Sequence, residues 1–222
     1  MIDATPITRQ GDPPGDRNQH GQAMGAKGIK TRRRLIDATV ALLEDKSLRD
    51  LRVAEIARRA RTSPATFYIY FSDAQDVVLA AIRELPQSTP QVMALAEIDW
   101  RAVDVRARAE DLLRVYAAFW QQHARLFQAR NLAAEEGDAR FIEARMESIR
   151  PLLQRFSEAV AAAQSDRRMP DDLDAYATAG ALIAMIERIA ATVRTYSRGS
   201  DSDNHGPMVS AAYILATTLG CR

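Results

Sequence analysis

The sequence predicts an all-α protein with two helical domains. Apolar residues recur at the three- and four-residue spacing of a helix face along most of the chain. No segment alternates at period two for long enough to suggest a sheet. Pro86 and Pro90 bracket a linker between four short predicted helices and several longer ones. We therefore expect a head at residues 27–85 and a body of five or six helices at residues 86–222.

The composition favours a globular protein in a reducing compartment. Hydrophobic residues make up 47% and charged residues 27%, which excludes wholesale disorder. The single cysteine, Cys221, cannot form an internal disulfide. Residues 1–26 are rich in glycine and proline without an apolar run, so a disordered tail is expected rather than a signal peptide. The most apolar stretch, between Asp174 and Glu187, is shorter than the roughly 18–20 residues of a membrane span. These features predict a cytoplasmic protein.

Four short helices are expected in the head. The third begins after Ser63, a side-chain cap that Pro64 follows at the first helical position. Asp73 is a fresh cap that separates the third helix from the fourth. The predicted ranges are Thr31–Glu44, Val53–Ala60, Pro64–Phe71 and Ala74–Leu85.

The body is expected to consist of long amphipathic helices. Pro151 lies inside the third of them and should kink or split it. Residues 199–206 are rich in glycine, serine and aspartate and are predicted to form a loop. The predicted helices are Val103–Gln122, Ala124–Ala133, Asp138–Ser165, Leu173–Ser197 and Pro207–Leu219.

Positive charge is concentrated in the head. The whole chain has a formal net charge of +1, but residues 27–71 hold eleven basic and five acidic residues. A basic module on a mildly acidic body is typical of proteins that bind the phosphate backbone of DNA. The alternative is that these charges only solvate helix faces.

The second and third head helices, joined by a short turn, form a predicted helix-turn-helix. The second helix of this motif fits the major groove of DNA. Here that helix carries small and hydroxyl-bearing side chains that can reach phosphates or base edges. Phe67 and Phe71, four residues apart, are core candidates. Tyr68 and Tyr70 cannot both point inward, although core packing is the alternative for either one.

Three strings in the head carry a family resemblance: Leu35-Ile36-Asp37-Ala38, Val53-x-x-Ile56-Ala57-x-x-Ala60 and Ser63-x-x-Thr66-Phe67-Tyr68-x-Tyr70-Phe71. Together they resemble the DNA-binding domain of the TetR family of bacterial transcriptional regulators. The resemblance implies a homodimeric, one-component regulator, a repressor, that binds a palindromic operator and is released by a small effector. The DNA contacts that it implies, with basic residues added as phosphate contacts, are Lys30, Arg33, Arg52, Ser63, Pro64, Ala65, Thr66, Tyr68, Ile69 and Tyr70.

Three residues depart from the pattern of the family. Arg61 stands in the turn where the family usually has glycine, so a strained or different turn is expected. Arg52 replaces the usual Ser or Thr cap of the second helix, which loses about 1 kcal/mol and adds a cation. Ala74 replaces a lysine that commonly contacts phosphate.

The last two body helices are the expected dimer surface. Both carry small residues, which allow helices to approach closely, and the resemblance implies a four-helix bundle across a dimer axis. The alternative is an intramolecular core. The predicted interface residues are Ala177, Gly180, Ala181, Ala184, Val209, Tyr213, Ala216 and Thr217.

Large side chains in the middle of the body are the predicted ligand site, since ligands commonly lie between bundle helices. Glu187 would be its polar anchor; alternatively it pairs with Arg188 or another arginine, and the aromatic stripe is core. A loose resemblance to the subgroup containing the mycobacterial ethionamide-resistance repressor implies an elongated, mostly apolar ligand. The predicted residues are Tyr116, Trp120, Phe127, Met146, Leu153, Phe156, Ile183 and Glu187.

Enzyme chemistry has little support in the sequence. His20, His123 and His205 lie in separate segments, and neither a Gly-rich phosphate loop nor a nucleophile elbow is present. We expect no catalytic residues, no metal and no cofactor. Two other classes stay open: a helical small-molecule-binding protein with a non-functional DNA head, and an enzyme with an unrecognised helical active site.

Overall fold

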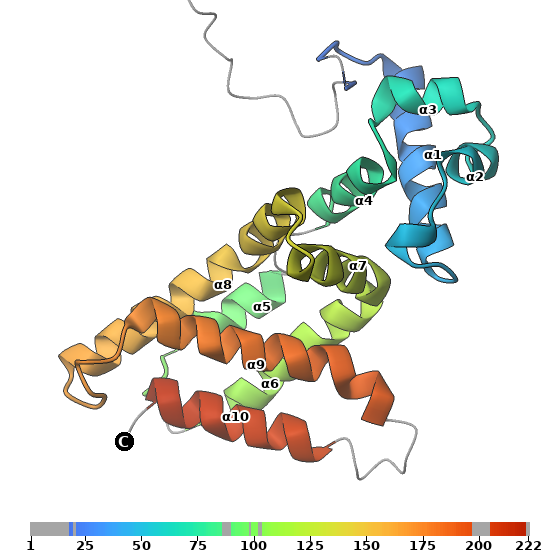
Figure 1. Ribbon diagram of the computed structural model, residues 1–222. Helices are drawn as coiled ribbons and strands as arrows, with labels where there is room; N and C mark the ends of the chain where they lie inside the picture. Colours follow the sequence, from blue (N-terminus) through green and yellow to red (C-terminus); the bar gives the residue numbers. More distant parts are fainter. Residues whose placement is uncertain are drawn as a thin grey trace, which may run out of the picture. The chain divides into compact units, whose positions relative to one another are not determined.

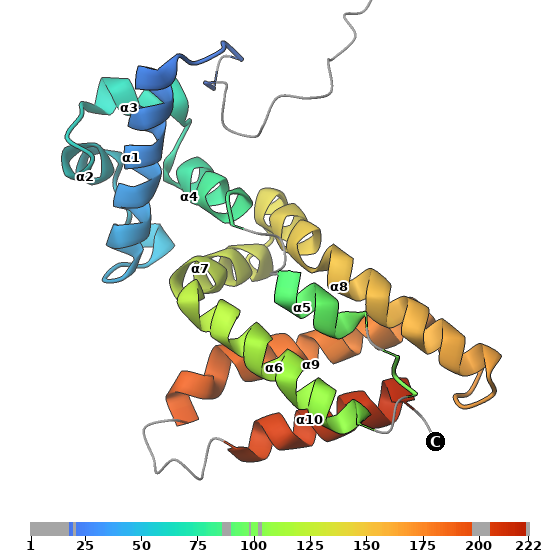
Figure 2. The ribbon, with the colours of Figure 1, turned by 180° about the vertical axis from the view of Figure 1, so that it is seen from behind.

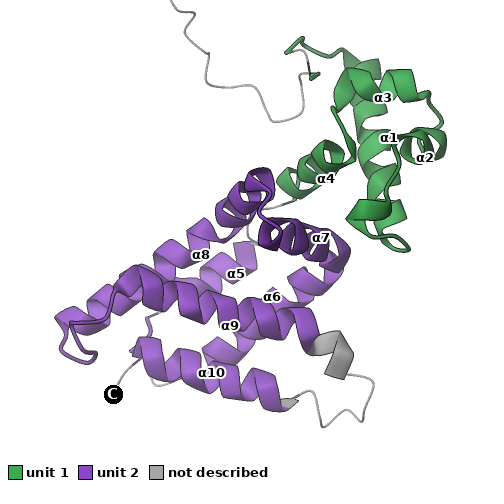
Figure 3. Ribbon diagram, viewed as in Figure 1, with its two compact units in different colours: residues 1–85 green, residues 86–222 purple. Residues whose placement is uncertain are grey.

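The computed structural model describes residues 18–19, 21–85, 90–97, 99–101, 104–196 and 205–220. Within these ranges the chain is helical and has no β-strand, which confirms the predicted fold class. The chain forms two compact units, Met1–Leu85 and Pro86–Arg222 (Figure 3). No helix in the described ranges is both long and apolar enough to cross a bilayer. Most of the predicted tail lies outside the described residues.

Unit 1 is built around its first helix. This helix packs against the second and fourth helices, and the third helix packs against the second (Figure 1). Leu35, Ile56, Phe67 and Val77, one from each helix, are fully buried and form its centre. The helices are α1 (Ala26–Leu43), α2 (Val53–Arg59), α3 (Pro64–Tyr70) and α4 (Ala74–Arg83), with a 3₁₀ turn at Leu48–Asp50.

The turn between α2 and α3 places Arg61 in the left-handed region, at φ 55°. The Thr62 N–H donates to the Ala57 carbonyl at 2.9 Å, and the Arg61 N–H donates to the Arg58 carbonyl at 3.1 Å. This pair of hydrogen bonds is the Schellman motif, which usually has glycine where Arg61 stands. The turn therefore adopts a glycine-type conformation at a non-glycine residue, which has a conformational cost.

Replacing Arg61 with glycine is expected to stabilise unit 1 by up to about 1 kcal/mol. A left-handed non-glycine residue costs about 1–2 kcal/mol, and the greater freedom of glycine in the unfolded chain offsets part of the gain. Urea unfolding followed by circular dichroism measures the difference. Arg58→Gly, inside α2 at an exposed position, is the control and should lose about 1 kcal/mol. A loss of stability in Arg61→Gly would contradict a strained turn.

Unit 2 is a bundle of longer helices (Figures 1 and 2). The longest, α8, packs against α7 and α9, while α6 packs against α9 and α10. The helices are α5 (Pro90–Ala96), α6 (Val105–Gln122), α7 (Ala124–Glu135), α8 (Ala139–Ser165), α9 (Ala175–Tyr196) and α10 (His205–Gly220).

Two prolines that stand out in the sequence lie in helices. Pro90 begins α5, a helix that the sequence does not predict, because proline fits the first turn of a helix, where its missing N–H has no partner to lose. Pro151 lies inside α8 without splitting it, since the helix continues to Ser165. The first helix also begins five residues before its predicted start, at Ala26.

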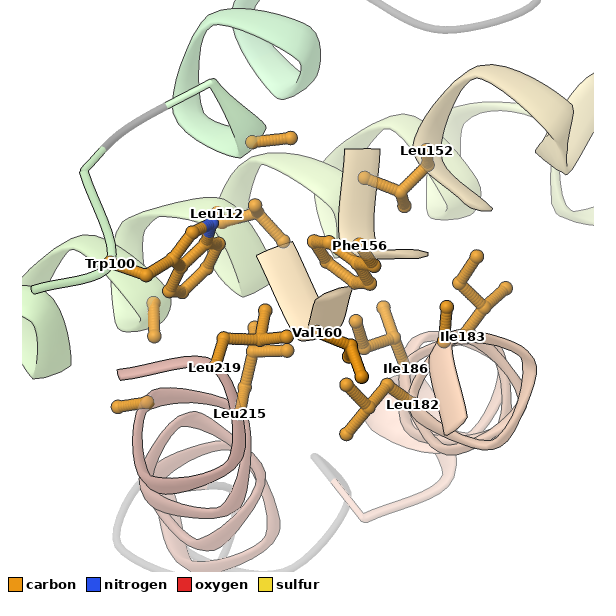
Figure 4. Packing of buried hydrophobic residues seen from close by; sticks show 14 of the residues in the cluster. Trp100, Leu112, Leu152, Phe156, Val160, Leu182, Ile183, Ile186, Leu215 and Leu219 are labelled. Atoms are coloured by element: carbon orange, nitrogen blue, oxygen red, sulfur yellow. The ribbon is translucent and has the colours of Figure 1, made fainter. Parts of the chain in front are cut away.

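The core of unit 2 centres on Phe156 of α8, which is fully buried (Figure 4). Leu112 of α6 and Ile183 of α9 lie around it, and the Trp100 ring makes an edge contact at 5.9 Å between centroids. Leu215 of α10 closes the same cluster. Val92 and Ala96 of α5 belong to the same cluster, so α5, α6, α8, α9 and α10 share one core.

Candidate functional site

The sequence of α3 separates an anchored face from an exposed one. Ser63 caps the helix, because its Oγ accepts a hydrogen bond from the Thr66 N–H at 3.1 Å. Phe67 is 0% exposed and fixes α3 to the core of unit 1. Tyr68 and Ile69 are 48% and 45% exposed. Large side chains at solvent on a short, well-anchored helix are suited to contact another molecule.

The remaining predicted groove contacts lie on or beside this face. Ser63, Pro64 and Ala65 are exposed, and Thr66 and Tyr70 are half-buried. The structure therefore brings together all seven predicted contacts of the third helix on one short segment.

The three basic residues predicted to contact phosphate differ in their surroundings. Lys30 is exposed on α1. The Arg33 guanidinium donates to Asp37 at 2.9 Å and to Glu84 at 2.9 Å, so carboxylates already neutralise it. Arg52 precedes α2 without capping it and donates to the Arg49 carbonyl at 2.9 Å.

Sequence reasoning missed Gln19 as a neighbour of α3. Its side-chain amide donates to the Tyr68 carbonyl, and its N–H donates to the Ile69 carbonyl at 3.4 Å. These contacts satisfy carbonyls at the end of a helix, where intrahelical partners are lacking. One polar residue within a stretch rich in glycine and proline carries no periodic signal that would predict them.

Apart from Glu187, the predicted ligand residues fall into three groups. Leu153, Phe156 and Ile183 are at most 2% exposed and belong to the core of unit 2, as the core alternative states. Trp120 is 2% exposed, and its ring lies 5.9 Å from that of Phe127. Tyr116 and Met146 are half-buried against the core.

Glu187 lies in a buried ionic cluster. Its Oε1 accepts from Arg130 Nη2 at 3.0 Å, and its Oε2 accepts from Arg145 Nη2 at 2.7 Å. Arg130 also donates to the Ser148 hydroxyl at 2.6 Å, and its guanidinium lies 4.7 Å from the Phe127 ring centre. Glu187 is thus buried, as an anchor would be, but it is paired with two arginines; its sequence neighbour Arg188 is exposed.

Burial and charge shift the pKa values around this cluster. Burial raises the pKa of the Tyr116 phenol, and the negative charge of Glu187 raises it further. Burial lowers the pKa of the Arg130 guanidinium, which Glu187 opposes. Both groups therefore lie in a poorly hydrated, strongly charged environment.

A separate open pocket of about 550 Å³ lies elsewhere in unit 2. Trp100, Leu219 and the ion-paired Arg155 and Arg168 are among its lining residues, but none of the predicted ligand residues is. In the described ranges, His, Cys, Asp and Glu form no cluster that suits a metal ion.

The predicted dimer residues lie mostly at the surface of α9 and α10. Tyr213 is 56% exposed, whereas Ala216 is 7% exposed and belongs to the intramolecular core. Tyr176 and Ile214, which sequence reasoning missed, are 56% and 46% exposed. Of the others, Gly180 and Val209 are half-buried, and the exposed ones are Ala177, Ala181, Ala184 and Thr217.

Two family models match the chain, one within each of its units. Residues 35–81 match bacterial regulatory proteins of the tetR family, and residues 93–205 match the tetracyclin repressor-like C-terminal domain. A segment of 95 residues is 35% identical to an HTH-type transcriptional regulator of Mycobacterium bovis, covering 41% of this chain and 41% of that protein.

Two solved structures share the fold. FadR from Bacillus subtilis, in complex with stearoyl-CoA, has a TM-score of 0.59 at 15% identity over 84% of this chain and 98% of that chain. A transcriptional regulator from Saccharomonospora viridis, in complex with choline, has a TM-score of 0.61 at 20% identity over 84% of this chain and 95% of that chain. With both of its units matched, the chain belongs to the TetR family of bacterial transcriptional regulators.

Proposed function

We propose that this regulator is a one-component repressor, which binds a palindromic operator as a homodimer and is released by a small, mostly apolar effector. The observation that carries the proposal is the exposed face of α3, with Tyr68 and Ile69 at solvent above a buried Phe67. Residues 27–71 hold eleven basic and five acidic residues, so this face would enter the major groove while lysine and arginine side chains contact phosphates.

A body that binds a small molecule supports the effector part of the proposal. The two solved structures were determined with stearoyl-CoA and with choline, so this fold accommodates chemically different ligands. An effector would release DNA by binding one arrangement of the heads better than the other. A coupling free energy of about 1–3 kcal/mol is enough for such a response.

A mobility-shift titration with the DNA upstream of the protein's own gene tests the proposal. We expect a specific complex whose affinity falls steeply with salt, because phosphate contacts release counterions. Non-specific competitor DNA should not displace this complex at low excess. A chain that binds no upstream region specifically would contradict the repressor and favour the binding protein with a non-functional head. Two features favour that alternative: Arg52 gives α2 no side-chain cap, and Ala74 stands where a cation could have contacted phosphate.

The exposed face of α9 and α10 is the proposed dimer interface. Tyr176, Tyr213 and Ile214 present large apolar surfaces to solvent in one protomer. The exposed alanines of α9 allow a partner helix to approach closely. A recognition helix reads one half-site, so pairing of two chains would give the affinity that a palindromic operator requires.

Replacing Ala181 with arginine is expected to convert the dimer to a monomer. The long charged side chain would stand at an exposed point of α9 where the partner helix should pack, and it would keep the two helices apart. Analytical ultracentrifugation over a range of concentrations measures the shift. Ala161→Arg, at an exposed point of α8, introduces the same side chain outside this face and should stay dimeric. Equal dimer affinities for the two variants would place the interface elsewhere.

A further inference from the structure

The ionic cluster of the body carries an excess of positive charge. Arg130 and Arg145 contribute two positive charges and Glu187 one negative charge. Arg130 and Glu187 are 2% and 4% exposed, so water screens their charges weakly. A net charge in such surroundings is costly unless another charge balances it. The cluster is therefore a favourable place for one more anion.

Hydrogen-bond donors at the cluster are also left unused. The Nε–H of Arg145 is buried and has no hydrogen-bond partner among the described residues, although Nη2 of the same side chain binds Glu187. The indole N–H of Trp120 is also buried and has no hydrogen-bond partner among the described residues. The Trp120 ring packs against the Phe127 ring, which in turn contacts the Arg130 guanidinium. The side chain of Arg145 as a whole is 34% exposed, so a ligand from solvent would first contact its exposed part and not the buried Nε.

The same geometry disfavours a cationic ligand. Each carboxylate oxygen of Glu187 already accepts a hydrogen bond from an arginine. A quaternary ammonium would meet two guanidinium groups before it met an unneutralised carboxylate. Electrostatic repulsion from Arg130 and Arg145 would outweigh attraction to the single paired anion.

Apolar side chains lie next to the cluster. Ile149 lies one helical turn beyond Arg145 on the same face of α8, and Met146 lies on the adjacent face. Both are half-buried and pack against the core of the unit, as does Tyr116 of α6. A ligand that reaches Arg145 would therefore have an apolar surface on which to place a hydrocarbon group.

We infer that the effector of this regulator is an amphiphilic carboxylate, an inference that rests on the proposed function. Its carboxylate pairs with the guanidinium of Arg145 and balances the excess charge of the cluster. Its apolar part lies along Tyr116, Met146 and Ile149. This assignment narrows the mostly apolar effector to one with a single acidic group.

Fluorescence titration of the full chain tests the inference. The chain has two tryptophans, so Trp100→Phe leaves Trp120 as the only emitter beside the cluster. Octanoate, octan-1-ol and octyltrimethylammonium are matched probes that differ in their head group. We expect a saturable change in emission with octanoate and none with the other two. Equal responses to all three, a response to the ammonium alone, or no response to octanoate would overturn the inference.

An arginine variant with a matched control locates the site. Arg145→Met should weaken octanoate binding by about 10- to 100-fold, the effect of losing one charge-assisted hydrogen bond. Arg150→Met, on the same helix but exposed, should bind octanoate as the parent chain does. Equal affinities of the two variants would overturn the assignment to Arg145. The comparison of probes on the parent chain stays decisive if Arg145→Met does not fold.

Operator binding separates failure of this inference from failure of the proposed function. If DNA is bound specifically but octanoate neither binds nor releases it, the repressor stands and the carboxylate effector is wrong. If octanoate binds through Arg145 but no operator is bound, the ligand site stands and the repressor is wrong.

Discussion

Replacing Tyr68 with alanine is expected to abolish specific operator binding while the protein stays folded. A side chain that reads a base or orients the recognition helix contributes about 1–3 kcal/mol, and the proposed dimer presents it twice. Because Tyr68 is 48% exposed, its truncation removes little packing and should cost less than about 1 kcal/mol of stability. Fluorescence anisotropy with a labelled operator at fixed salt measures the loss of affinity.

Phe67 provides a neighbouring aromatic control. It is 0% exposed, so Phe67→Ala should destabilise unit 1 by about 3–5 kcal/mol and lose DNA binding through unfolding. Thr66 is a less clean probe, because its N–H and hydroxyl both contact Ser63 at the helix cap. A Tyr68→Ala variant that binds the operator like the parent chain would show that α3 uses other side chains.

The α3 segment could be predicted because local chemistry fixes both of its ends. Ser63 and Pro64 define its start, and the cap at Asp73 opens the next helix. The start of α1 was harder to place, because Gly25 precedes it without a side-chain cap and exposed lysines occupy its first turns. Helix α5 is missing from the prediction because a proline marks the end of a linker and a first helical position equally well.

The partners of Glu187 show what sequence reasoning cannot provide. The glutamate interrupts an apolar stretch, so the sequence suggests two readings: a buried anchor for a ligand, or a partner of an arginine. Its partners Arg130 and Arg145 lie 57 and 42 residues away on two other helices. Helix periodicity identifies which face of each helix is buried, but the pairing depends on how three helices pack. The chain has many arginines, and only the packing selects these two.

Replacing Glu187 with alanine is expected to destabilise unit 2 by about 3–5 kcal/mol. The change removes the carboxylate that both arginines share and leaves Arg130, 2% exposed, as an unpaired buried charge. Urea unfolding of the full chain, followed in unit 2 through tryptophan fluorescence and in the whole chain through circular dichroism, measures the loss. Both tryptophans lie in unit 2, so fluorescence reports on that unit alone.

Glu158→Ala is the matched control on the surface of the same unit. Glu158 also pairs with an arginine, but both side chains are about half exposed, so water screens the pair and its loss should cost about 0–1 kcal/mol. Adding Arg130→Leu to Glu187→Leu should recover most of the stability, since the fully buried charge is removed with its partner. Arg145 also loses its carboxylate, but its side chain is 34% exposed, so water can partly solvate its charge. If the double variant is as unstable as Glu187→Ala, the cluster stabilises the unit through its hydrogen bonds to Ser148 and Asn131 and not through charge balance. Recovery would show instead that balanced charge is what the site requires, the same requirement that a bound carboxylate would meet at Arg145.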